Sequence, residues 1–370
     1  MQSLPISDNA TPSGAWTPDG RISRVVKIWL LTGVVMIFLQ IAIGGITRLT
    51  GSGLSITRWE IVTGTVPPLN AAQWEEAFAL YKQTPQYQKI NQGMSLPDFQ
   101  FIYFWEYFHR LWARMMFLVF IIPFGIFWWR GMFSQRLVPR LLILVLLAGL
   151  EGFFGWIMVA SGLIHRPWVN AYNLTLHLTM GLVIFSHLLW TTFMAFQPYP
   201  ERSGRDRDRR FAWGLLLLSF VQIALGAMMS GTKAGLFYPT WPDMKGEYLP
   251  AILFDGALWS VDSFTHYDTN PFMPALIHVL HRNTAYLLTA LVVWFMVSVM
   301  RRPDVPESYR MRLWLTGGFL TLQVILGILT VLACKGTIPV GLGVMHQGGA
   351  VLLLGALLWA TYAAGAGIRK

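Results

Sequence analysis

Eight stretches of this 370-residue sequence are apolar over roughly the 20 residues that a helix needs to cross a bilayer. Only 12% of the residues are charged, whereas soluble domains carry about 25%. Backbone groups inside a bilayer must be bonded within their own segment, so each stretch is predicted to be a helix. The predicted helices cover residues 25–47, 99–128, 138–162, 170–196, 211–232, 273–300, 310–333 and 339–366. We therefore expect an all-α integral membrane protein with eight transmembrane helices.

Basic residues between the predicted helices are concentrated on one side of the membrane. The segment after the fourth helix alone carries Arg202, Arg205, Arg207, Arg209 and Arg210. Because short cytoplasmic loops are rich in Lys and Arg, both termini are predicted to be cytoplasmic, with residues 1–23 as a polar tail. The net charge of +10 is then a topology signal with some attraction to anionic lipids, and no nucleic-acid partner is expected.

The sequence contains an internal repeat. Phe38-Leu-Gln-Ile-Ala-Ile-Gly44 in the first predicted helix matches Phe220-Val-Gln-Ile-Ala-Leu-Gly226 in the fifth. The second and sixth helices share a His-Arg pair, at His109-Arg110 and His281-Arg282. Four helices are an even number, so the two copies enter the membrane in the same direction, which makes this a parallel repeat.

We therefore expect two pseudo-repeated four-helix bundles, an N-terminal half over residues 24–200 and a C-terminal half over 201–370. Each half contains one outer segment too long for a simple turn, 48–98 in the first and 233–272 in the second. Long loops in compact proteins are usually functional, and these two contain several tryptophans and prolines. They are predicted to fold as caps over the membrane domain.

Four of the eight histidines lie at a common predicted depth, about 12–15 Å below the outer surface at 1.5 Å per residue. They are His109, His177, His281 and His346. One histidine on each of two facing helices is suited to bind haem iron from both sides, and a four-helix bundle can enclose a porphyrin. The repeat predicts two such sites, His109 with His177 and His281 with His346.

Other interpretations apply to any single one of these histidines. A histidine in a transmembrane helix is often only a hydrogen-bond partner between helices. A zinc or copper site would need ligands clustered in one bundle, and no local Cys/His spacing of that kind occurs. Four histidines at one depth in repeat-related positions favour haem.

The two predicted sites differ in their neighbours. Glu106 lies one turn before His109, whereas His278 takes that place before His281. Glu106 is either an acid or base group beside a bound porphyrin or simply the ion-pair partner of Arg110, four residues later. A redox cofactor in one half and a reacting substrate in the other would account for the difference.

Several further polar residues lie within the predicted helices. Arg110, Arg114 and Arg282 could meet haem propionates or brace neighbouring helices. Glu151 is an acid in the third helix whose partner the sequence does not identify. His187 is predicted to face away from His177 and towards the cytoplasmic side, because ten residues turn a helix by roughly 280° beyond whole turns.

The motifs of the first half resemble those of a known family. Gly44-Gly-Ile-Thr-Arg-Leu-Thr-Gly-Ser-Gly-Leu-Ser55 is followed by Pro67-Pro-Leu69 and then by Glu106-Tyr-Phe-His-Arg110. This run is similar to the haem A synthases, in particular to the branch found in mitochondria and related bacteria. The resemblance extends over about residues 24 to 366, and the first outer segment is its most specific part.

The resemblance implies a reaction, in which the ring methyl group of haem O is oxidised through a hydroxymethyl stage to the formyl group of haem A, for cytochrome oxidase biogenesis. It implies that His281 and His346 ligate a haem b cofactor, that His109 and His177 hold the substrate haem, and that Glu106 assists the oxidation. It also implies a place in the bacterial inner membrane, with a haem O synthase and an electron acceptor as partners. A homo-oligomer is compatible with the sequence.

Two rival functions stay open at this point. A b-type cytochrome that relays electrons from quinol would hold both haems as fixed cofactors. A membrane haem carrier would hold haem without changing it. A carboxylate beside one ligand pair and not the other favours the enzyme, because a relay needs no reacting site.

Overall fold

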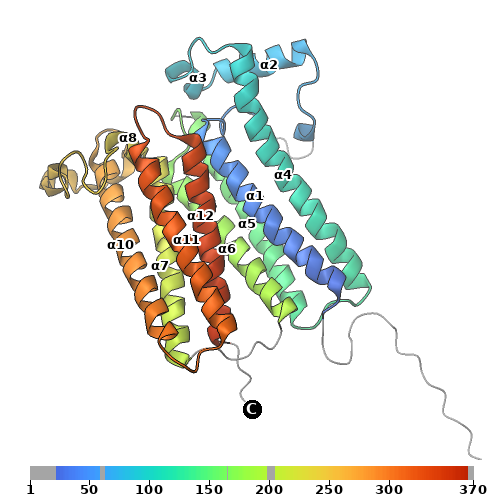
Figure 1. Ribbon diagram of the computed structural model, residues 1–370. Helices are drawn as coiled ribbons and strands as arrows, with labels where there is room; N and C mark the ends of the chain where they lie inside the picture. The colour runs from blue at the N-terminus through green and yellow to red at the C-terminus, as the bar shows by residue number, and fades with distance from the viewer. Residues whose placement is uncertain (1–21, 59–62, 165, 198–204, 366–370) are drawn as a thin grey trace, which may run out of the picture.

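The computed structural model describes residues 22–58, 63–164, 166–197 and 205–365. Eight of its helices are long and apolar enough to cross a membrane, which confirms the predicted fold class. No strand forms in the described residues, where a single isolated bridge joins Met244 to Glu247. The spanning helices are α1 (Arg24–Leu49), α4 (Leu96–Trp129), α5 (Leu137–Ile164), α6 (Ala171–Phe196), α7 (Asp206–Gly231), α10 (Phe272–Met300), α11 (Glu307–Leu332) and α12 (Val340–Gly365) (Figure 1).

Capping residues explain where several of these helices begin. Ser95 and Asp98 form a capping box at the start of α4, where the Ser95 hydroxyl accepts from the Asp98 backbone N–H and the carboxylate accepts from that of Ser95. Asn170 caps α6 by accepting from the backbone N–H of Tyr172 and Asn173. The helix predicted to begin at residue 211 begins five residues earlier, at Asp206, so that boundary was wrong. Hydropathy misses this turn because it is charged.

The spanning helices form a central group with four more around it. Helices α1, α6, α7 and α12 pack against one another. Around them, α4 packs on α1, α5 on α6, α10 on α7 and α11 on α12. Of the outer helices, α10 also packs on α11, whereas α4 and α5 touch each other much less. The N-terminal group is therefore more open on its outer side than the C-terminal one.

A large cluster of buried apolar residues extends towards the end of the bundle where α1 begins. Trp29 and Leu30 of α1 are buried there with Phe185 of α6, Leu288 of α10 and Leu354 of α12. The Trp29 indole also donates to the backbone oxygen of Val119 at 2.9 Å. Trp29, Leu288 and Leu354 also line the cavity described below, so this cluster forms part of its wall.

Both long outer segments contain short helices and lie at the opposite end of the bundle (Figure 1). The first contains η1 (Thr63–Thr65), α2 (Ala71–Lys82) and α3 (Pro85–Lys89), and α2 packs on the start of α4. The second contains α8 (Ala234–Phe237), η2 (Ala251–Phe254), η3 (Gly256–Leu258) and α9 (Val261–Thr265), of which α8, η2 and α9 pack on α10. Both segments thus cover the bundle at one end.

The first residue of α1 and the last turn of α12 lie at the same end of the bundle, away from the two outer segments (Figure 1). The predicted cytoplasmic tail, residues 1–23, falls almost wholly outside the described residues, and so does Arg202. The division into two repeated halves stays a prediction.

Candidate haem-binding cavity

A cavity of about 1500 Å³ runs through the outer part of the bundle. Residues of all eight spanning helices line it, and most of them are apolar. A drug-sized ligand typically occupies a pocket of roughly 300–1,000 Å³, so this cavity has room for more than one such molecule. The four predicted ligand residues, His109, His177, His281 and His346, all line it.

His281 of α10 and His346 of α12 face each other in the C-terminal half. Their ring centroids are 6.4 Å apart, and the ring planes are nearly perpendicular, at 84°. Two metal–imidazole bonds of about 2 Å in line, with the radius of each ring added, separate the centroids by roughly 6 Å. The two rings are therefore spaced as two axial ligands of one iron would be.

His109 of α4 and His177 of α6 reach the same cavity from the N-terminal half. Nε2 of His109 lies 3.0 Å from the side-chain nitrogen of Gln40 on α1. Nδ1 of His177 lies 3.1 Å from Oε1 of Glu151 on α5, so the partner of Glu151 that the sequence left open is this histidine.

Each of the four histidine rings lies against a glycine of a neighbouring helix. A Cβ at Gly44 would come 3.0 Å from the His109 ring, and one at Gly155 would come 3.2 Å from the His177 ring. In the C-terminal half the distances are 3.1 Å from Gly226 to His281 and 2.9 Å from Gly327 to His346. A side chain at any of these positions would push on the imidazole, so the glycines set where the rings can lie.

Glu106 is buried and held by several donors. Its Oε2 accepts from the backbone N–H and the hydroxyl of Ser55, both at 2.7 Å, and from the backbone N–H of Ile56 at 2.8 Å. Its Oε1 accepts from Arg110. Glu106 therefore joins the first outer segment to α4, and the ion pair with Arg110 considered from the sequence does form.

The arginines of the cavity wall have different partners. Besides Glu106, Arg110 reaches the backbone oxygen of Ile56 at 3.4 Å. Arg282 donates to the backbone oxygens of Pro242 at 2.7 Å and Tyr248 at 2.5 Å, which fastens the second outer segment to α10. Arg110 and Arg282 thus contact the outer segments rather than neighbouring helices, and the propionate role stays a prediction. Arg114 lines the cavity as well.

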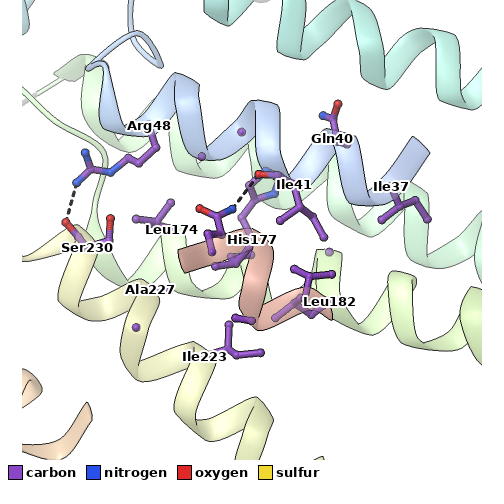
Figure 2. A pocket seen from close by; sticks show the side chains of 18 of the residues that line it. Ile37, Gln40, Ile41, Arg48, Leu174, His177, Leu182, Ile223, Ala227 and Ser230 are labelled. Carbon is purple, nitrogen blue, oxygen red and sulfur yellow. Dashed lines mark hydrogen bonds between the residues drawn. The ribbon is translucent and has the colours of Figure 1, made fainter. Parts of the chain in front are cut away.

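Two further cations lie where the halves meet. Arg48 on α1 donates to the backbone oxygen of Ser230 on α7 at 3.1 Å. Figure 2 shows this contact among the residues that line the cavity, His177 included. Lys233 lines the same cavity and lies over the Trp168 ring, 4.1 Å from its centroid. Burial, and then the charge of Arg48, lower the pKa of Lys233.

The remaining histidines lie in other surroundings. His278 is buried and lines the cavity, with its ring centroid 6.3 Å from that of Tyr238. Nε2 of His187 lies 3.1 Å from the backbone oxygen of Arg140, and the ring is not part of the cavity wall. His187 thus faces away from His177, as predicted. His266 is exposed and pairs with Asp262, and His165 lies outside the described residues.

Sequence analysis missed the glutamines that contact the histidines. Gln40 contacts His109, Gln222 contacts His281 at 3.1 Å, and Gln323 contacts His346 at 3.5 Å. The signal was present, because Gln40 and Gln222 occupy the same place in the repeated motif that also supplies Gly44 and Gly226. Gln40 and Gln323 contact Nε2 of their histidines, whereas Gln222 lies nearest Nδ1 of His281.

Replacing Gly327 by alanine should weaken haem binding in the C-terminal half. The new Cβ would lie 2.9 Å from the His346 ring, and overpacking of this kind costs roughly 1–3 kcal/mol, or about a fivefold to hundredfold loss of affinity. Haem per polypeptide, measured by absorbance after purification, checks this. Gly318→Ala on the same helix is the matched control, because no atom lies within 4 Å of its Cβ. Equal haem loss in both variants would contradict the prediction.

The chain is similar to characterised proteins along most of its length. The family described as "Cytochrome oxidase assembly protein" matches residues 27–358. The "Heme A synthase" of Agrobacterium fabrum is 41% identical over 333 residues, which are 90% of this chain and 88% of that protein. The "Heme A synthase" of a Bradyrhizobium species is 40% identical over 91% of this chain and 90% of that protein. That of Rhodospirillum centenum is 39% identical over 97% of this chain and 92% of that protein.

Proposed function

This chain belongs to the haem A synthase family of cytochrome oxidase assembly proteins, and we propose that it oxidises the ring methyl group of haem O, through a hydroxymethyl stage, to the formyl group of haem A. It is accordingly an oxidoreductase and a multi-pass protein of a bacterial membrane. One observation supports the proposal most strongly. Two imidazole pairs reach one cavity, and among the described residues that line it the carboxylates, Glu106 and Glu151, lie only beside the pair of the N-terminal half.

We assign the C-terminal pair, His281 and His346, to a haem b cofactor. The residues fit such a group: the centroid spacing of 6.4 Å suits two axial ligands, and Gly226 and Gly327 leave space at the rings. Nδ1 of His346 is buried and has no hydrogen-bond partner among the described residues. When bound, haem b would take up the electrons removed from the substrate. The packing of α10 on α11 closes this half, as a resident cofactor requires.

We assign the N-terminal pair, His109 and His177, to the substrate haem. A substrate must enter and leave, and the two helices that carry the outer wall of this half, α4 and α5, pack on each other much less than α10 and α11 do. The cavity is lined on this side by apolar residues of both helices, among them Met116, Phe120 and Leu144. This wall suits a porphyrin that arrives from the bilayer rather than from water.

Glu106 is the proposed acid or base of the reaction. Its Oε2 already accepts three hydrogen bonds, from Ser55 and Ile56, whereas Oε1 accepts one, from Arg110. A carboxylate has about four acceptor sites in all, two on each oxygen, so Oε1 is the atom with capacity to receive a proton released by the methyl group. Arg110 and Ser55 hold the carboxylate beside His109, one turn along α4.

The decisive experiment supplies haem O to the purified protein with an oxidant and analyses the extracted pigments. Haem O should disappear and haem A should form, while one haem b per chain stays bound. Two haem b per chain and no haem A would show a b-type relay. Haem O bound and released unchanged would show a carrier.

We also propose that both termini face the cytoplasm, because that end of the bundle carries most of the arginines, including Arg130, Arg136 and Arg301 in its loops and Arg310 in the first turn of α11. Alkaline phosphatase is active only outside the cytoplasm. Its fusion within residues 233–272 should be active, and its fusion within 130–136 should be inactive. The opposite result would reverse the orientation and place the cavity near the cytoplasmic side.

A further inference from the structure

One of the four histidines differs from the others in the group behind its ring. His109, His281 and His346 lie next to glutamine side chains, which contact Nε2 of His109 at 3.0 Å, Nδ1 of His281 at 3.1 Å and Nε2 of His346 at 3.5 Å. His177 instead lies next to a carboxylate, with Nδ1 3.1 Å from Oε1 of Glu151. Nδ1 has no hydrogen-bond partner among the described residues, so this carboxylate oxygen is the acceptor placed within reach of it.

Glu151 occupies the place that Gln323 has in the other half. Gly155 follows Glu151 by one turn and faces the His177 ring, and Gly327 follows Gln323 by one turn and faces the His346 ring. Both contacts reach the same ring atom, Cε1. Glutamate and glutamine have nearly the same shape, so the difference between the two places is one of charge and of hydrogen-bonding capacity.

The surroundings of Glu151 are arranged to hold its carboxylate against α6. A Cβ at Gly181, one turn after His177, would come 3.2 Å from Oε1, so a glycine there admits the carboxylate. The Glu151 side chain is 24% exposed, towards a cavity rather than bulk water, and its Oε2 has no hydrogen-bond partner among the described residues. The His177 ring is therefore the nearest polar partner that the structure gives it.

We propose that Glu151 is a positioning residue for His177, which accepts the Nδ1 proton and makes this imidazole a stronger electron donor than its three counterparts. A carboxylate behind a ligating histidine fixes the tautomer, so that Nε2 is free to bind a metal, and raises the basicity of the ring. A glutamine in that place raises the basicity of the ring less, because it carries no charge. The inference rests on the proposed role of His177 as a ligand of the substrate haem.

The test exchanges the two groups, as Glu151→Gln and Gln323→Glu, in the full-length protein with haem b bound and haem O added without oxygen. A more basic ligand favours ferric iron, so Glu151→Gln should raise the midpoint potential of haem O and leave that of haem b unchanged. Gln323→Glu should lower the midpoint potential of haem b alone. Turnover of Glu151→Gln should fall about 10- to 100-fold, as for other partners of metal ligands.

An unchanged haem O potential in Glu151→Gln, with the haem b potential shifted in Gln323→Glu, would overturn the inference. If Glu151→Gln no longer binds haem O, the Glu151→Asp variant is measured next. Recovery of haem O binding in Glu151→Asp supports a role of the charge. Loss of binding in both variants shows a packing role and overturns the inference. The His177→Ala variant separates a failure of the inference about Glu151 from a failure of the proposed function. Full haem O binding in that variant would refute His177 as a ligand, whatever Glu151 does.

Discussion

Alanine at His281 or His346 should remove haem b and with it essentially all activity, whereas alanine at His109 or His177 should spare haem b and abolish binding of haem O. Each imidazole would supply one of the two protein bonds to a bound iron, and hydrogen-bond partners of a ligand alone are worth roughly 10- to 100-fold in affinity, so the loss of a ligand should exceed about 100-fold. Haem b content is measured from the absorbance of the purified protein, and haem O binding by titration into it.

His187→Ala is the matched control for this series. His187 lies on the same helix as His177, but its ring contacts the backbone oxygen of Arg140 and is outside the cavity wall. It should keep both haem binding and activity. If His109→Ala removed haem b while His346→Ala spared it, the assignment of cofactor and substrate to the two halves would be reversed.

Glu106→Gln should lower turnover by about 10²–10⁴-fold, the usual contribution of a general acid or base, with haem b still bound. The amide oxygen can still accept from Ser55, so the first outer segment stays attached. The amide nitrogen cannot take up a proton, and it would face Arg110 without a charge to pair with. The measurement is haem A formed per minute from added haem O.

The exposed Glu76→Gln serves as control, because Glu76 makes only a surface ion pair with Arg58 at 3.6 Å. Near-normal turnover in Glu106→Gln would remove this carboxylate from the chemistry and leave it as the anchor of the first outer segment. Loss of haem b in Glu106→Gln would mean that the substitution also disturbs the C-terminal half. Ser55→Ala would then measure how much the hydrogen bonds that hold the first outer segment contribute to that loss.

Hydropathy alone predicted all eight spanning helices, because bilayer crossing leaves the backbone no alternative to helix. Their ends were less predictable. The charged turn Asp206–Arg210 was excluded from the helix, although Asp206 and Asp208 lie in its first turn, where carboxylates favour a helix start, and Asp208 also bonds Arg302 at 2.8 Å. That second contact joins residues 94 positions apart, which no local pattern contains.

The four cavity histidines could be predicted because ionisable residues are rare inside membrane helices and these four share a depth. The role of the amides was harder to predict: the repeat marks Gln40 and Gln222, but a glutamine in a membrane helix has many possible partners. Gln347, for example, follows His346 directly, yet it donates to the backbone oxygen of Ile41 at 2.8 Å. The partners of Arg282 were hidden for a similar reason, because its acceptors are backbone oxygens whose position depends on the path of the second outer segment.

The glycine behind each histidine has a consequence for how porphyrins come and go. With the backbone of a neighbouring helix against one side of the ring, an imidazole can swing only towards the cavity, so its withdrawal on the other side requires two helices to part. In the N-terminal half these are α4 from α1, at Gly44, and α5 from α6, at Gly155. Since α4 and α5 restrain each other little, we expect exchange to follow slow breathing of these two helices, at a rate set by the thickness and fluidity of the lipid around them.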